Sequence, residues 1–231
     1  MQQETNSKGN GWLWPLWGVA AGVLGYVGHV FSMTDLTEAQ RATGVSVVSE
    51  LSQTGYHVGV VAGMFAVFCV LVLAAGWWRW ANANAPSSIA GGLVPLSLVA
   101  SAGAMILGYG LKGMLAIYLP GGIDGNHPNE GLYTLFIIDD MFPFMAWYGV
   151  AMAAAGMVWL SLREHRLPTW IGILSVLFVV APVGVLIVTG LPGFPGVVQP
   201  LWLIIVSIGM ALSLRRAPAR VTQPGFATAA G

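Results

Sequence analysis

Three ionisable side chains lie within long apolar stretches of the sequence: Lys112, Asp139 and Asp140. A charged group in hydrocarbon is costly, so a residue of this kind normally has a partner or a function. One lysine neutralises only one of two carboxylates, and the other must be protonated, paired with a histidine, or bound to a cation or ligand. Three interpretations stay open: an ion pair that only locks two helices together, a site for a proton, cation or polar ligand, and an aspartate that reaches the outer loop and water.

Three histidines could complete such a site. His29 falls about four residues before the end of the first apolar stretch, and His57 falls at a similar depth at the start of the second. Two histidines at one depth on antiparallel helices could ligate a haem or another metal, although His57 lies opposite the glycine stripe of its own helix. His127 lies in the glycine-rich loop 119–131 and could cover the same pocket. We therefore predict a ligand-binding site formed by the lysine, the two aspartates and these three histidines.

The composition excludes several classes of protein. Of the 231 residues, 56% are hydrophobic and only 8% are charged, and the mean hydropathy is +0.75. A soluble domain carries about a quarter charged residues, so the chain is not an ordinary water-soluble globule. Its formal net charge is zero, so the chain lacks the excess of positive charge that nucleic-acid binding requires. The single cysteine, Cys69, allows neither an internal disulfide nor a cysteine-based metal cluster.

Six stretches approach or exceed the length of about 20 apolar residues that a helix needs to cross a membrane. We predict an all-α, six-helix membrane bundle that forms a single domain over residues 1–215. A disordered cytoplasmic tail is predicted over 216–231, because this segment is rich in proline, alanine and glycine. The predicted spans cover residues 14–33, 56–78, 89–118, 132–162, 170–191 and 198–214.

The distribution of charge predicts the orientation, because lysine and arginine in short loops stay on the cytoplasmic side. With the N-terminus inside, Arg41 is the only loop cation that lies outside. Eight tryptophans also fall at the predicted cytoplasmic ends, where their amphipathic rings favour the membrane interface. Both termini are therefore predicted to be cytoplasmic. The cytoplasmic cations are Lys8, Arg79, Arg163, Arg166, Arg215, Arg216 and Arg220, and the tryptophans are Trp12, Trp14, Trp17, Trp77, Trp78, Trp80, Trp159 and Trp170.

The spacing of the ionisable residues places them at one depth. Lys112 lies about six residues, or about 9 Å, before the outer end of the third span, and the two aspartates lie about 11 Å after the outer start of the fourth. Spans joined by a short loop are antiparallel neighbours, so these groups are expected to meet. Pro143 cannot donate to the carbonyl of Asp139 and is expected to kink the helix. The pattern does not distinguish Asp139 from Asp140 as the partner of the lysine, because adjacent helix residues differ by about 100° in facing.

The outer loop 34–55 is long for a connection within a bundle. It carries Val45, Val48 and Leu51 beside serine, glutamate and glutamine side chains. This spacing predicts a short amphipathic helix on the outer surface or across the end of the bundle, and a partly helical linker is nearly as compatible with it.

Two motifs in the last third of the chain resemble known proteins. A helix start reads Arg-Leu-Pro-Thr-Trp-Ile-Gly over residues 166–172, and the final span opens with Gln-Pro-Leu-Trp over 199–202. Together with a glycine- and proline-rich outer turn, they resemble a broad group of uncharacterised bacterial multi-span membrane proteins, classed as domains of unknown function. The resemblance covers roughly the last 70 residues. It implies a protein of the bacterial cytoplasmic membrane and carries over no catalytic residue.

These observations favour a protein of the lipid bilayer with an outward-facing polar pocket. The pocket would bind a small polar or cationic group, or the head of an amphiphile whose tail lies among the helices. A second interpretation is an accessory or scaffold subunit of a larger membrane complex, because the loops are small and the helices are lined with glycine. A membrane enzyme that uses a carboxylate as general acid or base on a lipid-soluble substrate is the third. No nucleophile, metal motif or cofactor signature accompanies that carboxylate.

Overall fold

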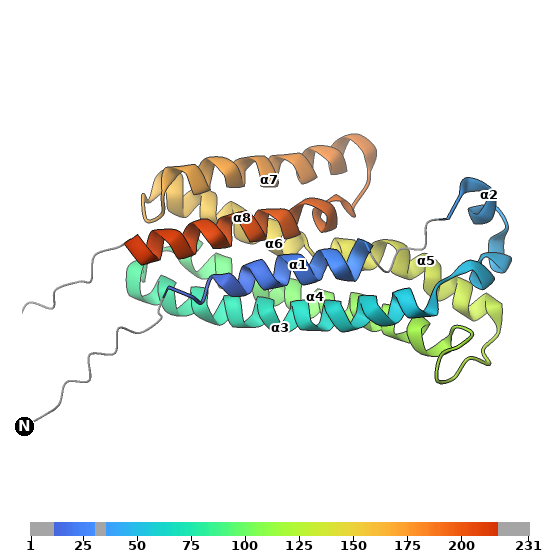
Figure 1. Ribbon diagram of the computed structural model, residues 1–231. Coiled ribbons are helices and arrows are strands. Elements are labelled where there is room, and N and C mark those ends of the chain that lie inside the picture. The colour runs from blue at the N-terminus through green and yellow to red at the C-terminus, as the bar shows by residue number, and fades with distance from the viewer. Residues whose placement is uncertain (1–11, 31–35, 217–231) are drawn as a thin grey trace, which may run out of the picture.

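The computed structural model describes residues 12–30 and 36–216, and this part of the chain is helical throughout, without strands (Figure 1). Two short helices of other types accompany the α-helices: a 3-10 helix at Gly44–Glu50 and a π-helix at Trp159–Arg163. The α-helices are α1 (Leu16–Val30), α2 (Glu38–Arg41), α3 (Gln53–Asn84), α4 (Ile89–Tyr118), α5 (Asn129–Met145), α6 (Tyr148–Val158), α7 (Thr169–Thr189) and α8 (Phe194–Arg216).

Within the described residues, five helical segments are long and apolar enough to cross a membrane: α3, α4, the segment Asn129–Arg163 that comprises α5, α6 and the π-helix, α7 and α8. The predicted class, an α-helical multi-span membrane protein, is therefore confirmed. The first predicted span differs from the others, because α1 has only 15 described residues and so extends about 22 Å. Residues 31–33 of that span lie outside the described residues, as does the tail from 217 onward, while Arg216 belongs to α8.

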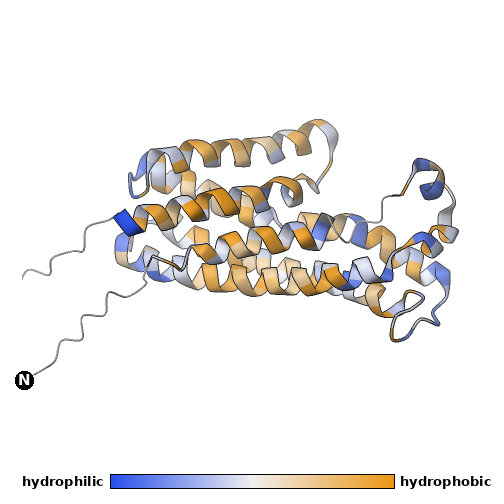
Figure 2. Cartoon of the chain, in the orientation of Figure 1, coloured by the Kyte–Doolittle hydropathy of each residue, from blue (hydrophilic) through white to orange (hydrophobic). Residues whose placement is uncertain are grey.

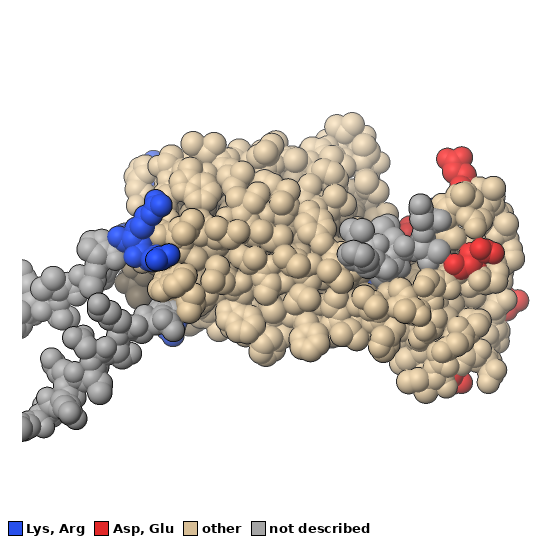
Figure 3. All heavy atoms as spheres, viewed as in Figure 1, with Lys and Arg blue, Asp and Glu red and all other residues tan. Residues whose placement is uncertain are grey.

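The long helices run up and down between two chemically different ends, which Figure 3 shows as blue and red patches. Apolar residues occupy the length between them (Figure 2). The ends of α1 and α8 meet at the basic end, where the Arg215 guanidinium lies 5.6 Å from the centre of the Trp12 ring. We name the two ends by the charged residues that dominate them. The basic end carries Arg79, Arg163, Arg166, Arg215 and Arg216, and the acidic end carries Glu38, Glu50, Asp124 and Glu130.

α4 lies at the centre of the bundle, packed against α3, α5 and α6, while α1 packs between α3 and α8. The interior contains side chains such as Leu98, Met105 and Trp202, which are almost fully buried. α7 is peripheral and packs mainly on α6 and α8 (Figure 1). Only 28% of its most apolar stretch is buried, against 50% in the other four long segments. Its outer face is therefore left for lipid or for another protein.

The fourth span is broken close to Pro143, as the sequence predicts. α5 ends at Met145, α6 begins at Tyr148, and the two residues between them form a turn. The hydroxyl of Ser101 on α4 donates to the carbonyl of Ala146 in this turn. A buried carbonyl without a donor destabilises a fold, so this hydrogen bond stabilises the break.

The outer loop before α3 covers the acidic end of the bundle. This position across the end of the bundle is one of those predicted from the sequence. Its central segment is the 3-10 helix rather than an α-helix, and the buried valines are Val47 and Val48, whereas the predicted Val45 is only half-buried. The loop contributes to a second apolar cluster, separate from the main core. That cluster contains Leu36, Val47, Val48, Leu51, Tyr56, Leu115, Ala116, Leu119, Leu132 and Phe136.

A polar contact joins α7 to α8 where a proline interrupts α7. Pro182 has no N–H, so the carbonyl of Phe178 lacks its usual helical donor. The side-chain amide of Gln199, which is fully buried on α8, donates to that carbonyl over 2.6 Å. The missing helical hydrogen bond is therefore replaced by one between helices.

Candidate functional site

Lys112 of α4 and Asp139 of α5 form a buried ion pair in the half of the bundle nearer the acidic end. The Nζ atom of Lys112 lies 3.1 Å from Oδ2 of Asp139, and the two residues are 3% and 2% exposed. The two helices approach closely because Gly108, one turn before the lysine, has no side chain: a Cβ there would lie 3.0 Å from Cα of Pro143. Asp139 is therefore the partner of the lysine, which the sequence left open.

Only one of the two carboxylate oxygens of Asp139, Oδ2, is hydrogen-bonded to Lys112. Within the described part of the chain, the buried Oδ1 atom of Asp139 has no hydrogen-bond partner. On the other side of the pair, the Lys112 ammonium lies 5.4 Å from the centre of the Tyr56 ring, in cation–π contact. Oδ1 is thus a buried acceptor that a water molecule or a ligand donor can satisfy.

His29 is buried in an aromatic cluster beside this pair. Its ring stacks on Phe144 at 4.6 Å between ring centres and on Tyr109 at 5.8 Å, and the Trp147 ring packs edge-on at 5.8 Å. The histidine is 1% exposed and lies within electrostatic range of Lys112. As the sequence predicts, it therefore faces protein rather than lipid.

Asp140 faces a different environment from Asp139. It is half-buried and lines a cavity of about 240 Å³ at the acidic end, between α5, α8 and the loop before α8. Among the described residues it has no hydrogen-bond or ion-pair partner. Arg41 lines the same cavity, and the remaining walls are mainly apolar, formed by Met141, Phe144, Leu191, Gly193, Phe194 and Val197.

The other two predicted histidines lie apart from this group. His57 is exposed on the outer side of α3, so the structure does not bring it to Lys112 and the aspartates. His127 lies in the exposed loop, where its Nε2 atom is 3.2 Å from Asp124 and its ring packs on Tyr118. Within the described residues, no group of three or more histidine, cysteine, aspartate or glutamate side chains is arranged to hold a metal ion.

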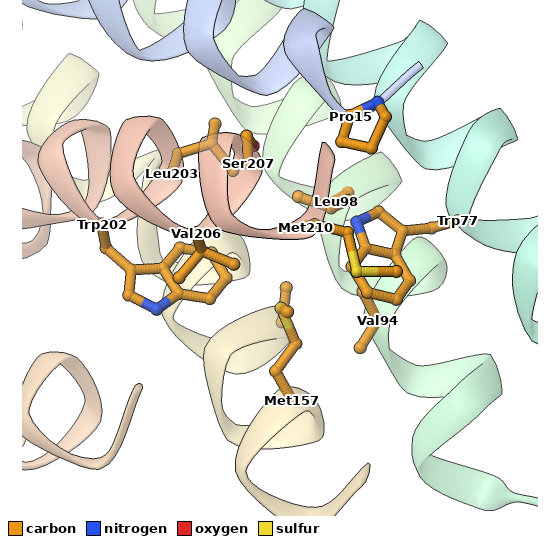
Figure 4. Close-up of a pocket in the computed structure, with 11 residues that line it drawn as sticks. Pro15, Trp77, Val94, Leu98, Met157, Trp202, Leu203, Val206, Ser207 and Met210 are labelled. Carbon is orange, nitrogen blue, oxygen red and sulfur yellow. The ribbon is translucent and has the colours of Figure 1, made fainter. Parts of the chain in front are cut away.

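The interior near the basic end is filled by apolar side chains. Figure 4 shows Trp77, Met157, Trp202 and Met210 turned toward one another from α3, α6 and α8. The cavity among them is only about 10 Å³, room for about one water molecule. Among the described residues, the buried histidine, lysine and aspartate, which are His29, Lys112 and Asp139, lie in the half of the bundle nearer the acidic end.

Fold and site together define a multi-pass α-helical membrane protein with a buried ion pair and, at its acidic end, a cavity lined by Asp140 and Arg41. No family model, curated protein or solved structure matches the chain. The function must therefore be inferred from these side chains.

Sequence reasoning missed Arg41 and Tyr56 as members of the site. Arg41 stands out in the sequence as the one cation of the outer loops, and that isolation was a usable signal. Tyr56 carried no such signal, because a tyrosine at the end of a span is ordinary at a membrane interface. Its contact with Lys112 depends on how α3 packs against α4.

Proposed function

We propose that this chain is a six-span protein of the bacterial cytoplasmic membrane, with both termini cytoplasmic, whose acidic-end cavity binds the polar head of an amphiphilic ligand. In this arrangement α1 is the additional span. The placement of arginine at one end and acidic residues at the other supports this orientation.

The observation that carries the proposal is the difference between the two aspartates. Lys112 is bonded to Asp139, so the charge of Asp140 is left for the cavity that it lines. A carboxylate at a site with low-dielectric walls attracts a cation or a hydrogen-bond donor more strongly than it would in water. The ligand head that Asp140 binds is therefore an ammonium or hydroxyl group. Arg41 lines the same cavity but is exposed, so solvent and salt screen its charge.

The rest of the cavity suits the tail of an amphiphile. Phe144, Phe194 and Val197 give it apolar walls between α5 and α8. Such a cavity, mainly apolar with a few polar groups, is the usual composition of a small-molecule site. His29 and the ion pair hold one wall in place, because Phe144 stacks on the histidine and lies on the same helix as Asp139.

A matched series of ten-carbon amphiphiles tests the proposal. Decylamine, decanol and decanoate differ only in the head, and their binding to the full chain in lipid nanodiscs can be measured by titration calorimetry. We expect decylamine to bind best, and Asp140→Asn to weaken it by about tenfold or more, because a charge-assisted hydrogen bond is lost. Glu130→Gln is the matched control, since Glu130 is an exposed acid on the same helix and does not line the cavity.

Equal binding of the three amphiphiles, or equal loss in both variants, would contradict the proposal. Asp140→Asn removes a charge that has no ion-pair partner among the described residues, so the fold should tolerate it. Circular dichroism melting of each variant checks this directly.

A second candidate function, an accessory subunit of a membrane complex, is favoured by α7. This helix exposes Ile173, Leu177, Val180, Ile187 and Val188 on its outer side, each by at least 60%. A partner helix could cover this face, although lipid would satisfy it equally well. Extraction from the native membrane in mild detergent, followed by native mass spectrometry, distinguishes a lone 24.3 kDa chain from a complex.

A further inference from the structure

We propose a second binding site, at the basic end, for a single zwitterionic phospholipid: an acyl chain lies between α4 and α6, and the head group binds Glu164 and Arg166. This site is at the opposite end of the bundle from the acidic cavity. It does not depend on the function proposed for that cavity.

A groove of about 500 Å³ runs between the start of α4 and the end of α6. Leu93, Ala155 and Trp159 contribute mainly apolar surface to it. Trp159 is 55% exposed, and Ile89, which also lines the groove, is 90% exposed, so the groove opens at the surface of the bundle. In a membrane this opening faces lipid, so the apolar group that can enter the groove is an acyl chain.

The groove continues into a polar cavity of about 290 Å³ lined by Arg166. The two spaces share Ser87, Ser88 and Glu164, so they form one elongated site with an apolar part and a polar part. A molecule that fits both parts is an amphiphile with its head toward the basic end. This is the orientation of a lipid in the leaflet on that side.

The polar part carries both signs of charge, and the negative one is held in place by a hydrogen bond. The hydroxyl of Ser88 donates to Oε1 of Glu164 over 2.7 Å and also accepts the N–H of Gly91, which caps α4. The backbone N–H of Arg166 donates to the carbonyl of Leu160 over 2.8 Å. The Glu164 carboxylate is thus held by Ser88, and the hydrogen-bonded backbone of Arg166 brings its exposed side chain to the same cavity.

Two irregularities of the backbone bring these residues together. The span ends in the π-helix Trp159–Arg163, a type of turn that is frequent at functional sites. His165, between the two charged residues, has a φ of 52°, in the left-handed region that side chains other than glycine rarely adopt. Such conformations cost free energy and cluster at ligand sites.

The charges select the class of lipid. A phosphate group would bind the Arg166 guanidinium, and an ammonium group would bind Glu164. An anionic head without an ammonium would leave Glu164 unpaired and would be repelled by it, as would the carboxylate of a fatty acid. A head of the ethanolamine type satisfies both residues.

Native mass spectrometry of the full chain released from nanodiscs tests the proposal. The discs contain equal amounts of phosphatidylethanolamine and phosphatidylglycerol with the same acyl chains. We expect one retained lipid per chain, with phosphatidylethanolamine favoured by about tenfold. Glu164→Gln should reduce this preference to near equality, because glutamine keeps an oxygen that accepts from Ser88 but loses the charge.

Filling the groove tests the position of the acyl chain. Ala155→Phe should reduce the retained lipid several-fold, whereas Met152→Phe, on the exposed face of the same helix, should leave it unchanged. Retention in the proportions of the disc, or the same loss in both phenylalanine variants, would overturn the proposal. Circular dichroism melting identifies a variant that fails to fold, and Glu164→Gln remains informative in that case because it changes no volume.

Discussion

Removal of the Lys112 charge should destabilise the protein more than almost any other single substitution of an ionisable residue in the described chain. At an effective dielectric constant of about 20, opposite charges 3.1 Å apart attract by about 5 kcal/mol, and desolvation of both groups offsets much of this. Lys112→Met leaves the Asp139 carboxylate, which is 2% exposed, buried without a counter-charge. We expect the free energy of unfolding to fall by about 3–5 kcal/mol.

The paired substitution Lys112→Met with Asp139→Leu separates loss of charge pairing from loss of packing. Replacing both charges by apolar groups is often neutral or stabilising, so the double variant should recover most of the loss. Unfolding in mixed micelles with increasing sodium dodecyl sulfate, followed by circular dichroism, measures all three proteins. Glu130→Gln, an exposed charge removal on α5, should change the value by less than about 0.5 kcal/mol.

The reasoning would be refuted if Lys112→Met cost less than about 1 kcal/mol, which is the range of exposed ion pairs. Water would then reach the pair, and the burial of both side chains would not describe the protein in a membrane. A double variant as unstable as the single one would also refute it. The cost would then come from packing.

The same unfolding assay tests two contacts elsewhere in the bundle. Gly63→Leu should cost about 1–3 kcal/mol, because a side chain there overlaps the Tyr109 ring, whereas Gly103→Leu, with open space around it, should be tolerated. Gln199→Leu should cost about 1–3 kcal/mol by leaving a buried carbonyl without a donor. Adding Pro182→Ala should recover part of that loss by restoring the helical N–H, and no recovery would show that the amide acts in another way.

The local pattern of the sequence was enough to predict long apolar helices and the separation of basic from acidic residues at their two ends. Apolar runs are long and arginine is concentrated at one end, and both features follow from the solvent on each side of a membrane rather than from packing. The break near Pro143 was also predictable from a local feature, since a proline removes a helical donor wherever it lies. The helix ends were predicted less well: α3 covers Gln53–Asn84 where the prediction was 56–78, and α8 begins at Phe194 and continues to Arg216, the first residue of the predicted tail.

The approximate depth of the buried ion pair also followed from the sequence alone. Counting residues from the ends of two antiparallel helices brings Lys112 and the aspartates to one level, because the rise per residue is constant. The count cannot choose between Asp139 and Asp140, since neighbours on a helix point about 100° apart and the turn at Ala146 breaks the helix. The packing of α4 against α5 determines that Asp139 is the partner of Lys112.

Only the tertiary structure determines which residues line the cavity at the acidic end. Arg41 lies about 100 residues from Asp140 in the sequence, and the fold of the outer loop brings both to one cavity. His57 has the same residue type and depth as His29, yet one is exposed and the other buried. Depth depends on position along a helix, which the sequence encodes directly. Which side chains share a site depends on how helices rotate and pack against one another, and only the folded chain determines that.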